Sequence, residues 1–178
     1  MSAPEVVNAE CLHSPGDVEA ACARMAGAID SWLDGRDGLA LCLLQGGIVP
    51  AGLLLPRIAA PLQLDSIHVT RYRNTTRGHE LDWHALPKTQ VRGRRILLID
   101  DILDEGESLA GVRQWCEQHE AASVWTAVLV DKCHTRKNPR VRADCAGLQV
   151  PDRYVFGYGM DYRGWHRNAA GIFALGDS

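Results

Sequence analysis

A short apolar run that ends directly in acidic residues constrains the fold of this chain more than any other feature. It runs Ile96-Leu97-Leu98-Ile99-Asp100-Asp101-Ile102-Leu103-Asp104-Glu105-Gly106-Glu107-Ser108-Leu109. The apolar residues predict a buried parallel strand with two carboxylates at its tip. A tight loop at Gly106 then leads into the start of a helix. A strand, loop and helix in this order indicate an α/β fold, in which ligands bind at the carboxyl ends of the strands.

Strand and helix patterns alternate along the rest of the chain. Ser14 and Pro15 predict a helix start, with Asp17 as the reciprocal partner of the Ser14 cap, and an apolar stripe continues to Leu33. A continuous apolar run at 39–44 predicts the next buried strand. The remaining predicted elements are helices at 48–58 and 107–119 and strands at 66–70, 95–100, 123–130, 154–158 and 171–175. We therefore expect an α/β fold with a mainly parallel central sheet flanked by helices.

Length and composition exclude several classes of protein. The 178 residues fit one domain, and a net charge of −3 argues against a dedicated nucleic-acid or membrane-surface protein. The six cysteines form no C-x-x-C pair, which favours reduced thiols. The N-terminus has no signal-peptide pattern, and no apolar run reaches the roughly 18 residues of a membrane span. We expect a cytoplasmic protein that binds neither nucleic acid nor membrane.

The charged residues are segregated along the chain. Five acids occupy the eight positions from 100 to 107, seven bases lie between 71 and 95, and five bases lie between 132 and 142. Charge runs are usually solvated loops. This acidic run, however, begins where a strand ends, which is where α/β folds place their ligands. Its position favours a site that handles a polyanion together with a divalent metal.

The loop at Gly106 has the features of a phosphate site. A helix N-terminus offers free N–H groups and the positive end of a dipole. Glycine permits a backbone path that points several N–H groups at one anion. The adjacent carboxylates of Asp100 and Asp101 suit a sugar diol or its metal. Because five acids would repel a bare polyphosphate, the electrostatics favour Mg²⁺ as a cofactor.

This stretch resembles the PRPP-binding motif of the type I phosphoribosyltransferases: an apolar strand, two acids, two apolar residues, then Asp-x-Gly-x-Ser/Thr. Further segments resemble the hypoxanthine-guanine branch, in the expected order across residues 40–175. They are Leu44-Gln45-Gly46-Gly47, Val130-Asp131-Lys132, and Pro151-Asp152-Arg153-Tyr154-Val155-Phe156-Gly157-Tyr158-Gly159-Met160-Asp161-Tyr162 followed by Arg167. The resemblance implies a single domain, 1–178, with a core at about 35–150 and a small hood built from about 1–15 and 150–178.

The resemblance also implies roles for single residues. Asp100 and Asp101 would bind the ribose hydroxyls of PRPP, directly or through metal, and Asp104 would be the general base at purine N7. The 5′-phosphate would lie in the loop made of Asp104, Glu105, Gly106, Glu107 and Ser108. The pyrophosphate would be bound by Gln45, Gly46, Gly47 and Arg167.

The purine would be recognised by Lys132, Tyr154, Val155 and Asp161. Lys132 would donate to O6, which selects a 6-oxo base because a 6-amino group cannot accept that bond. Tyr154 would stack on the ring, and the main chain of Val155 would contact its edge. Asp161 would help to hold a second magnesium. Arg71 and Tyr72 would belong to a mobile loop that closes over the site.

The sequence departs from the branch at several positions. Gln45 replaces a lysine of the pyrophosphate loop, and Glu105 and Glu107 replace Thr and a basic residue of the phosphate loop. We expect both glutamate side chains to point outward. Arg71 replaces a serine, and our hypothesis is that Arg73, Arg77 or both restore the charge lost at Gln45.

The implied function is transfer of the 5-phosphoribosyl group from PRPP to hypoxanthine or guanine, by a homodimer or homotetramer. Alternatives stay open. Asp100 and Asp101 also suit a capped strand end, and Asp104 suits a helix N-cap. The base could be xanthine, and a non-catalytic regulator on the same fold could use the basic segments to bind nucleotide and RNA.

Overall fold

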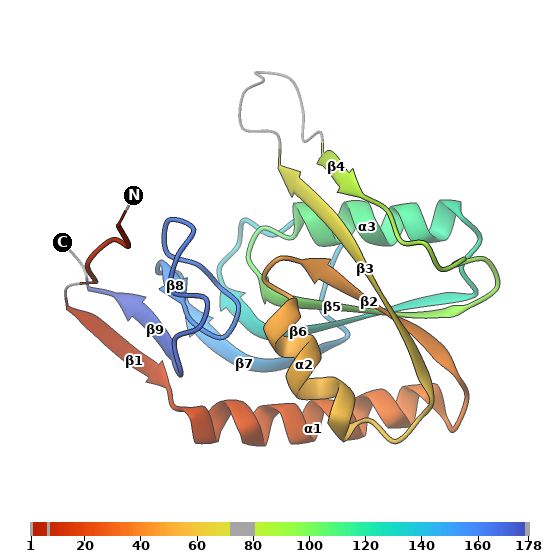
Figure 1. Cartoon of the computed structure of the whole chain (residues 1–178), viewed down its shortest axis with the longest axis horizontal. Coiled ribbons are helices and arrows are strands. Elements are labelled where there is room, and N and C mark those ends of the chain that lie inside the picture. The colour runs from red at the N-terminus through yellow and green to blue at the C-terminus, as the bar shows by residue number, and fades with distance from the viewer. Residues whose placement is uncertain (1, 7, 72–80, 177–178) are drawn as a thin grey trace.

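A six-stranded sheet forms the centre of the computed structural model, which describes residues 2–6, 8–71 and 81–176 (Figure 1). Its strands lie side by side in the order β4 (Leu81–Ala85), β3 (Leu62–Arg71), β2 (Gly38–Leu44), β5 (Arg95–Leu103), β6 (Ser123–Cys133) and β7 (Cys145–Pro151). All neighbours are parallel except β3 and β4. The predicted mainly parallel sheet is confirmed.

Strand order places a crevice between β2 and β5. The chain passes from β2 to β3 on one side and returns to β5 on the other side of β2. Such a reversal separates the loops that leave the two strands, so open α/β sheets bind ligands there, at the carboxyl ends. In this chain those loops carry the Gln45-Gly46-Gly47 segment and the acidic run.

Helices cover both faces of the sheet, and strand residues alternate between two cores (Figure 1). Leu39, Leu41 and Leu43 pack in one core with residues of α3 (Glu107–Gln118). Ala40 and Cys42 pack in the other with residues of α1 (Pro15–Leu33) and α2 (Ile48–Leu54). Because successive strand residues point to opposite faces, a strand buried on both sides must be apolar throughout, as the run at 39–44 is.

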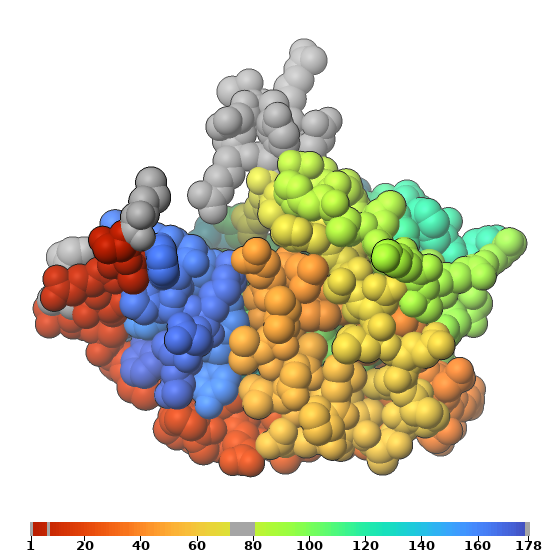
Figure 2. Space-filling model, in the orientation of Figure 1, coloured from red at the N-terminus to blue at the C-terminus, as the bar shows by residue number. Residues whose placement is uncertain are grey.

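A second, three-stranded antiparallel sheet joins the two ends of the chain. Its order is β1 (Ala9–His13), β9 (Ile172–Leu175) and β8 (Val155–Phe156). Figure 2 shows the N-terminal and C-terminal segments side by side at one end of the molecule. The Arg153 guanidinium ties them, because it donates to Leu175 O at 2.6 Å and pairs with Glu10. The domain boundaries inferred above stay a prediction.

Local sequence explains where several elements begin and end. The Ser14 hydroxyl accepts from Asp17 N at 3.2 Å and the Asp17 carboxylate accepts from Ser14 N at 2.8 Å, which confirms the predicted capping box. The helix predicted at 48–58 ends at Leu54 and continues as a 3₁₀ turn over Leu55–Arg57, since Pro56 cannot continue an α-helix. The strand predicted at 154–158 covers only Val155–Phe156, because Gly157 turns the chain at φ 101°.

Three strands are absent from the sequence-based assignment. β1 and β4 have mostly exposed residues, and β7 alternates without a continuous apolar run. Among the described residues, no helix is long and apolar enough to cross a membrane.

Candidate active site

Two carboxylates lie at the tip of β5, where the sequence predicts them. Asp101 N donates to Asp100 Oδ1 at 2.9 Å, and Ile102 N donates to Asp101 Oδ1 at 2.8 Å. Burial raises the pKa of Asp100 well above its ordinary value, and the charge of Asp101 raises it further. Burial also raises the pKa of Asp101, although hydrogen bonds and Arg167 oppose this. The pair therefore favours a cation nearby.

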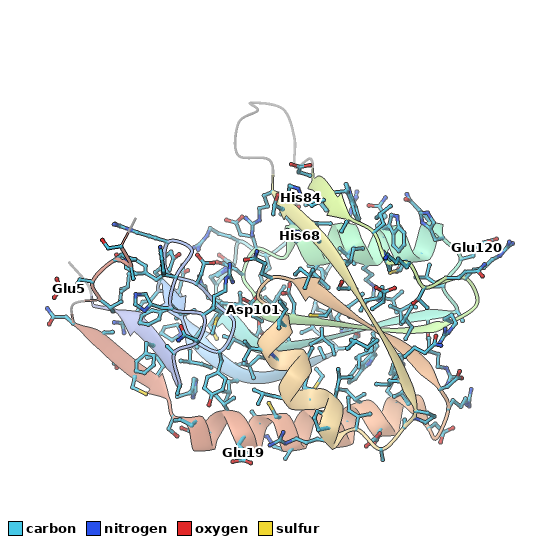
Figure 3. The ribbon with its side chains drawn as sticks, viewed as in Figure 1. Glu5, Glu19, His68, His84, Asp101 and Glu120 are labelled. Carbon is cyan, nitrogen blue, oxygen red and sulfur yellow. The ribbon has the colours of Figure 1, made fainter. Side chains whose placement is uncertain are left out.

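Three loops meet around Asp101 at distances that only glycine allows. A Cβ atom on Gly46 would lie 1.9 Å from Asp101 Oδ2, and one on Gly159 would lie 2.2 Å from Gly46 O. A Cβ atom on Gly47 would lie 2.6 Å from the carbonyl oxygens of Leu43 and Ile99. Figure 3 places Asp101 beside the end of β2 and the start of α2. The Leu44–Gln45 peptide bond is cis.

The acidic loop turns into α3 at Gly106, which adopts φ +80°. Gly106 is the N-cap residue, and no side-chain hydrogen bond caps this helix within the described part of the chain. The alternative that Asp104 caps the helix is therefore wrong. The first N–H groups of a helix need partners from outside it, and an anion such as phosphate can supply them.

Asp104 lies between two donors. Lys132 Nζ is 2.7 Å from Asp104 Oδ2, and His134 Nε2 is 2.7 Å from Asp104 Oδ1. Burial alone would raise the pKa of Asp104, but the hydrogen bonds of Lys132 and His134, together with the charge of Lys132, outweigh it and lower the pKa. Asp104 is therefore held ionised at neutral pH. The sequence assignment missed His134, whose only signal was its place two residues after Lys132.

Two neighbouring cavities open at this edge of the sheet. The larger, about 1010 Å³, is lined by Leu43, Leu44, Gln45, Gly46, His68, Val69, Thr70, Arg71, Asp100, Asp101, Ile102, Asp104, Gly106, Glu107, Ser108, Leu109, Asp161 and Arg167. The smaller, about 200 Å³, is lined by Asp101, Ile102, Asp104, Lys132, Tyr154, Val155, Met160 and Asp161. Asp101, Ile102, Asp104 and Asp161 line both, so the two cavities meet at these residues.

Arg167 and Asp161 form a fixed pair at the wall of the larger cavity. Arg167 Nη2 is 2.7 Å from Asp161 Oδ1, and Arg167 Nη1 donates to Gly159 O at 2.6 Å. Gly164 N donates to Asp161 Oδ2 at 2.7 Å, so both oxygens of this carboxylate have partners. Arg167 Nη1 also lies 3.9 Å from Asp101 Oδ2. The guanidinium is thus held in position next to the acidic pair.

Several residues that the sequence analysis assigned to the site do not lie in the two cavities, or differ from expectation. Gly47 and Glu105 line neither cavity; Glu105 is 2.5 Å from Arg71 in an ion pair. Glu107 does not point clear of the site as expected, because it lines the larger cavity and accepts from Asn138 Nδ2 at 3.2 Å. Tyr72, Arg73 and Arg77 fall outside the described residues.

Part of the positive charge of the basic segment 132–142 is neutralised by acidic residues that lie outside it. Arg136 pairs with both oxygens of Asp152 at 2.6 and 2.8 Å, and Lys137 pairs with Asp131. Asn138 N donates to Glu105 O at 2.8 Å, which fastens the segment onto the loop that leads into α3. These contacts hold the segment in place beside the site, where Lys132 lines the smaller cavity.

Comparison with known proteins agrees with this geometry. Residues 9–163 match the family described as phosphoribosyl transferase domain. The hypoxanthine-guanine phosphoribosyltransferase of Bacillus subtilis is 35% identical over 138 residues, 77% of this chain and 76% of that protein. The Streptococcus pneumoniae protein of the same name is 28% identical and covers 92% and 91% of the two chains.

A crystal structure of a hypoxanthine phosphoribosyltransferase from Staphylococcus aureus superposes with a TM-score of 0.88 at 26% identity. The match covers 94% of this chain and 91% of that one. The chain therefore belongs to the phosphoribosyltransferase family, in the branch of the hypoxanthine-guanine phosphoribosyltransferases.

Proposed function

We propose that this protein transfers the 5-phosphoribosyl group from PRPP to hypoxanthine or guanine in purine salvage, giving IMP or GMP and pyrophosphate. The observation that carries the proposal is the position of Asp104. This ionised carboxylate lies where a large cavity with an acidic strand tip meets a small pocket that contains buried Lys132. A sugar phosphate and a 6-oxo purine in these two cavities would meet at Asp104.

PRPP would occupy the larger cavity. The N-terminus of α3 and the Ser108 hydroxyl would bind the 5′-phosphate, with Glu105 and Gly106 shaping the loop. Asp100 and Asp101 would bind the ribose hydroxyls. The main chain of Gln45, Gly46 and Gly47 and the side chain of Arg167 would bind the pyrophosphate.

Magnesium fits the carboxylates at this site. Among the described residues no group of three or more His, Cys, Asp or Glu side chains could hold a metal alone. Mg²⁺ commonly takes one or two carboxylates and completes its shell with water and phosphate oxygens, which the paired Asp100 and Asp101 would allow. Asp161 would contribute to a second ion. Magnesium bound here would neutralise charge on the pyrophosphate.

The purine would occupy the smaller pocket. Lys132 would donate to O6, and Tyr154, which is 50% exposed at the pocket wall, is free to stack on the ring. As the bond to pyrophosphate breaks, C1 of the ribose gains oxocarbenium character and a purine nitrogen attacks from the opposite face. Asp104 would accept the N7 proton, and Arg167 would stabilise the departing charge. Arg71 and Tyr72 would help to exclude water.

We further propose that the protein acts in the cytoplasm as a homodimer or homotetramer. The free state of Cys11, Cys22, Cys42, Cys116, Cys133 and Cys145 suits a reducing compartment. Ile48 and Leu64 are 54% and 57% exposed and are candidates for a subunit contact. Sedimentation analysis tests the oligomeric state.

The proposal is tested by incubating the protein with PRPP, Mg²⁺ and hypoxanthine, guanine, xanthine or adenine, and following pyrophosphate release. We expect turnover with hypoxanthine or guanine and none with adenine. Turnover confined to xanthine would shift the substrate assignment, and no turnover with any 6-oxo purine would refute the enzyme. Salt-sensitive RNA binding without turnover would favour the regulator, although Lys132, Arg136 and Lys137 already have acidic partners within the protein.

A further inference from the structure

His134 is a buried titratable side chain at the site to which neither the motif nor the proposed function assigns a role. It follows the end of β6, and its side chain is only 3% exposed. Its Nε2 atom lies 2.7 Å from Asp104 Oδ1, while Lys132 Nζ lies 2.7 Å from the other oxygen of the same carboxylate. The two donors thus approach Asp104 at different oxygens.

The second ring nitrogen of His134 identifies its protonation state. The backbone N–H of Arg136 donates to His134 Nδ1 at 3.1 Å. A nitrogen that accepts a hydrogen bond carries no proton, so Nδ1 holds the lone pair and Nε2 carries the hydrogen of the neutral ring. His134 is therefore oriented to donate from Nε2–H to the Asp104 carboxylate.

The loop that carries His134 is itself held in place. The Arg136 guanidinium binds both oxygens of Asp152, at 2.6 and 2.8 Å, in the connection between β7 and β8. The charged groups in this part of the site are thus Asp104, Lys132, Arg136 and Asp152, linked in two ion pairs. The backbone at Arg136 that fixes the ring is anchored by a two-point contact, which is the more specific form of this ion pair.

The two donors to Asp104 have different tasks once a purine binds. Under the proposed function, on which this inference rests, Lys132 Nζ donates to purine O6 and shares or leaves its contact with Asp104. His134 has no such competing partner, since its other nitrogen is already bonded within its own loop. His134 is then the fixed donor that keeps the carboxylate aligned while it receives the N7 proton.

We propose that His134 is a positioning residue for the general base: its Nε2–H orients Asp104 toward the purine during transfer. Because the contact concerns the chemical step and not PRPP, its loss should lower kcat and leave the KM for PRPP nearly unchanged. The donor N–H, not the bulk of the ring, should be the property that matters.

The test compares His134→Leu, which keeps bulk but has no donor, with His134→Gln, whose amide N–H reaches close to the position of Nε2. Cys133→Ser, at the exposed neighbouring residue, is the matched control. We expect His134→Leu to lose kcat by about 10-fold or more, with the KM for PRPP within about threefold. His134→Gln should recover most of that loss, and Cys133→Ser should match the wild type.

An unchanged kcat in His134→Leu, or equal losses in folded Leu and Gln variants, would overturn the inference while wild-type turnover still supports the proposed function. A measurement on the wild-type protein does not depend on any variant folding. In ¹⁵N-labelled protein, NMR of the His134 ring should show the neutral Nε2–H form. The Nδ1–H form would overturn the inference, because Nε2 would then be an acceptor. Absence of wild-type turnover with every purine would instead refute the proposed function.

Discussion

Gly46 lies so close to the carboxylate of Asp101 that a Cβ atom at position 46 would be 1.9 Å from Asp101 Oδ2. The Gln45-Gly46-Gly47 loop and the acidic strand tip are therefore in direct contact, with no room for a side chain between them. The same loop also supports Gly159, whose Cβ position lies 2.2 Å from Gly46 O. A side chain at position 46 must therefore displace the Asp101 carboxylate.

We expect Gly46→Ala to lower kcat/KM for PRPP by about 100-fold, since a displacement near 1 Å at an active site can have an effect of that size. Gly52→Ala is the matched control, because Gly52 lies in α2 with nothing within 4 Å of its Cβ position. In the interior of a helix that change should add about 0.5–1 kcal/mol of stability and leave activity intact. Steady-state kinetics and thermal unfolding of both variants provide the comparison. Equal activities would contradict the close contact.

Asp100→Asn is expected to make the protein more stable and less active. Burial, with the charge of Asp101, raises the pKa of Asp100 in the folded state above its unfolded value, so the ionised side chain opposes folding at neutral pH. This penalty grows as the pH rises above the ordinary carboxyl value and vanishes below it. At pH 7.5 the variant should therefore have the higher Tm, by about 2–4 °C for each kcal/mol that the substitution adds to the free energy of unfolding. The two proteins should have the same Tm at about pH 4.

Measuring the Tm with and without Mg²⁺ distinguishes an effect of the Asp100 charge from an effect of side-chain packing. Excess Mg²⁺ should raise the Tm of the wild type more than that of Asp100→Asn, because the amide carries no charge for the ion to neutralise. A variant that melts below the wild type at pH 7.5 without magnesium would show that the carboxylate is stabilising there.

Asp104→Asn should have the opposite effect on stability. In the wild type, the pKa of Asp104 is lowered in the folded state, because the hydrogen bonds of Lys132 and His134 outweigh burial. The ionised carboxylate therefore stabilises the fold above the unfolded-state pKa, and this contribution is lost as the pH falls through the lower folded-state value. We expect Asp104→Asn to melt below the wild type at pH 7.5, with the difference closing in acid. A higher Tm than the wild type would contradict the assigned contacts.

The same substitution should separate chemistry from binding. If Asp104 accepts the N7 proton, Asp104→Asn should lose about 100- to 10,000-fold in kcat, while the KM for PRPP changes by less than about threefold. Single-turnover and steady-state rates with hypoxanthine measure both quantities. Equal losses in rate and in PRPP affinity would assign Asp104 a structural role.

Arg167→Ala is expected to weaken PRPP binding. The guanidinium is held by Asp161 and Gly159 at the wall of the larger cavity, where it would meet the pyrophosphate. Hydrogen bonds to charged groups contribute about 1.5–3 kcal/mol, so the KM for PRPP should rise by about 10- to 100-fold. Arg163→Ala is the control, since Arg163 lies over the Tyr162 ring outside both cavities. Similar KM values for the two variants would argue against the pyrophosphate contact.

The site residues that could be predicted from the sequence are those that lie close together in the chain. An apolar strand, two acids and a glycine before a helix are contiguous in the chain, so Asp100, Asp101, Asp104 and Gly106 could be placed without tertiary contacts. His134 could not, because its role depends on a partner 30 residues away and on a backbone N–H that no pattern encodes. The Arg71–Glu105 pair likewise joins two strand ends that are distant in sequence.

Strands β1 and β4 could not be predicted from the sequence for a related reason. The residues of β4 lie at a sheet edge, and those of β1 lie in the small sheet, where burial is too low to impose a periodic pattern. The central strands β2 and β5 are buried on both faces, and their apolar runs identify them.

The small sheet sets the order in which the site can be completed during protein synthesis. Val155 pairs with Ala174, Leu175 N donates to Tyr154 O at 3.0 Å, and Ala9 pairs with Leu175. A nascent chain can therefore assemble the strands of the large sheet, with Asp100, Asp101 and Lys132, before β9 has been translated. The wall that carries Tyr154 and Val155 must wait for that strand and for the closure of nearly the whole chain. Arg167 lies between β8 and β9, so the cation expected to bind pyrophosphate waits for the same closure, and both cavities should be completed together.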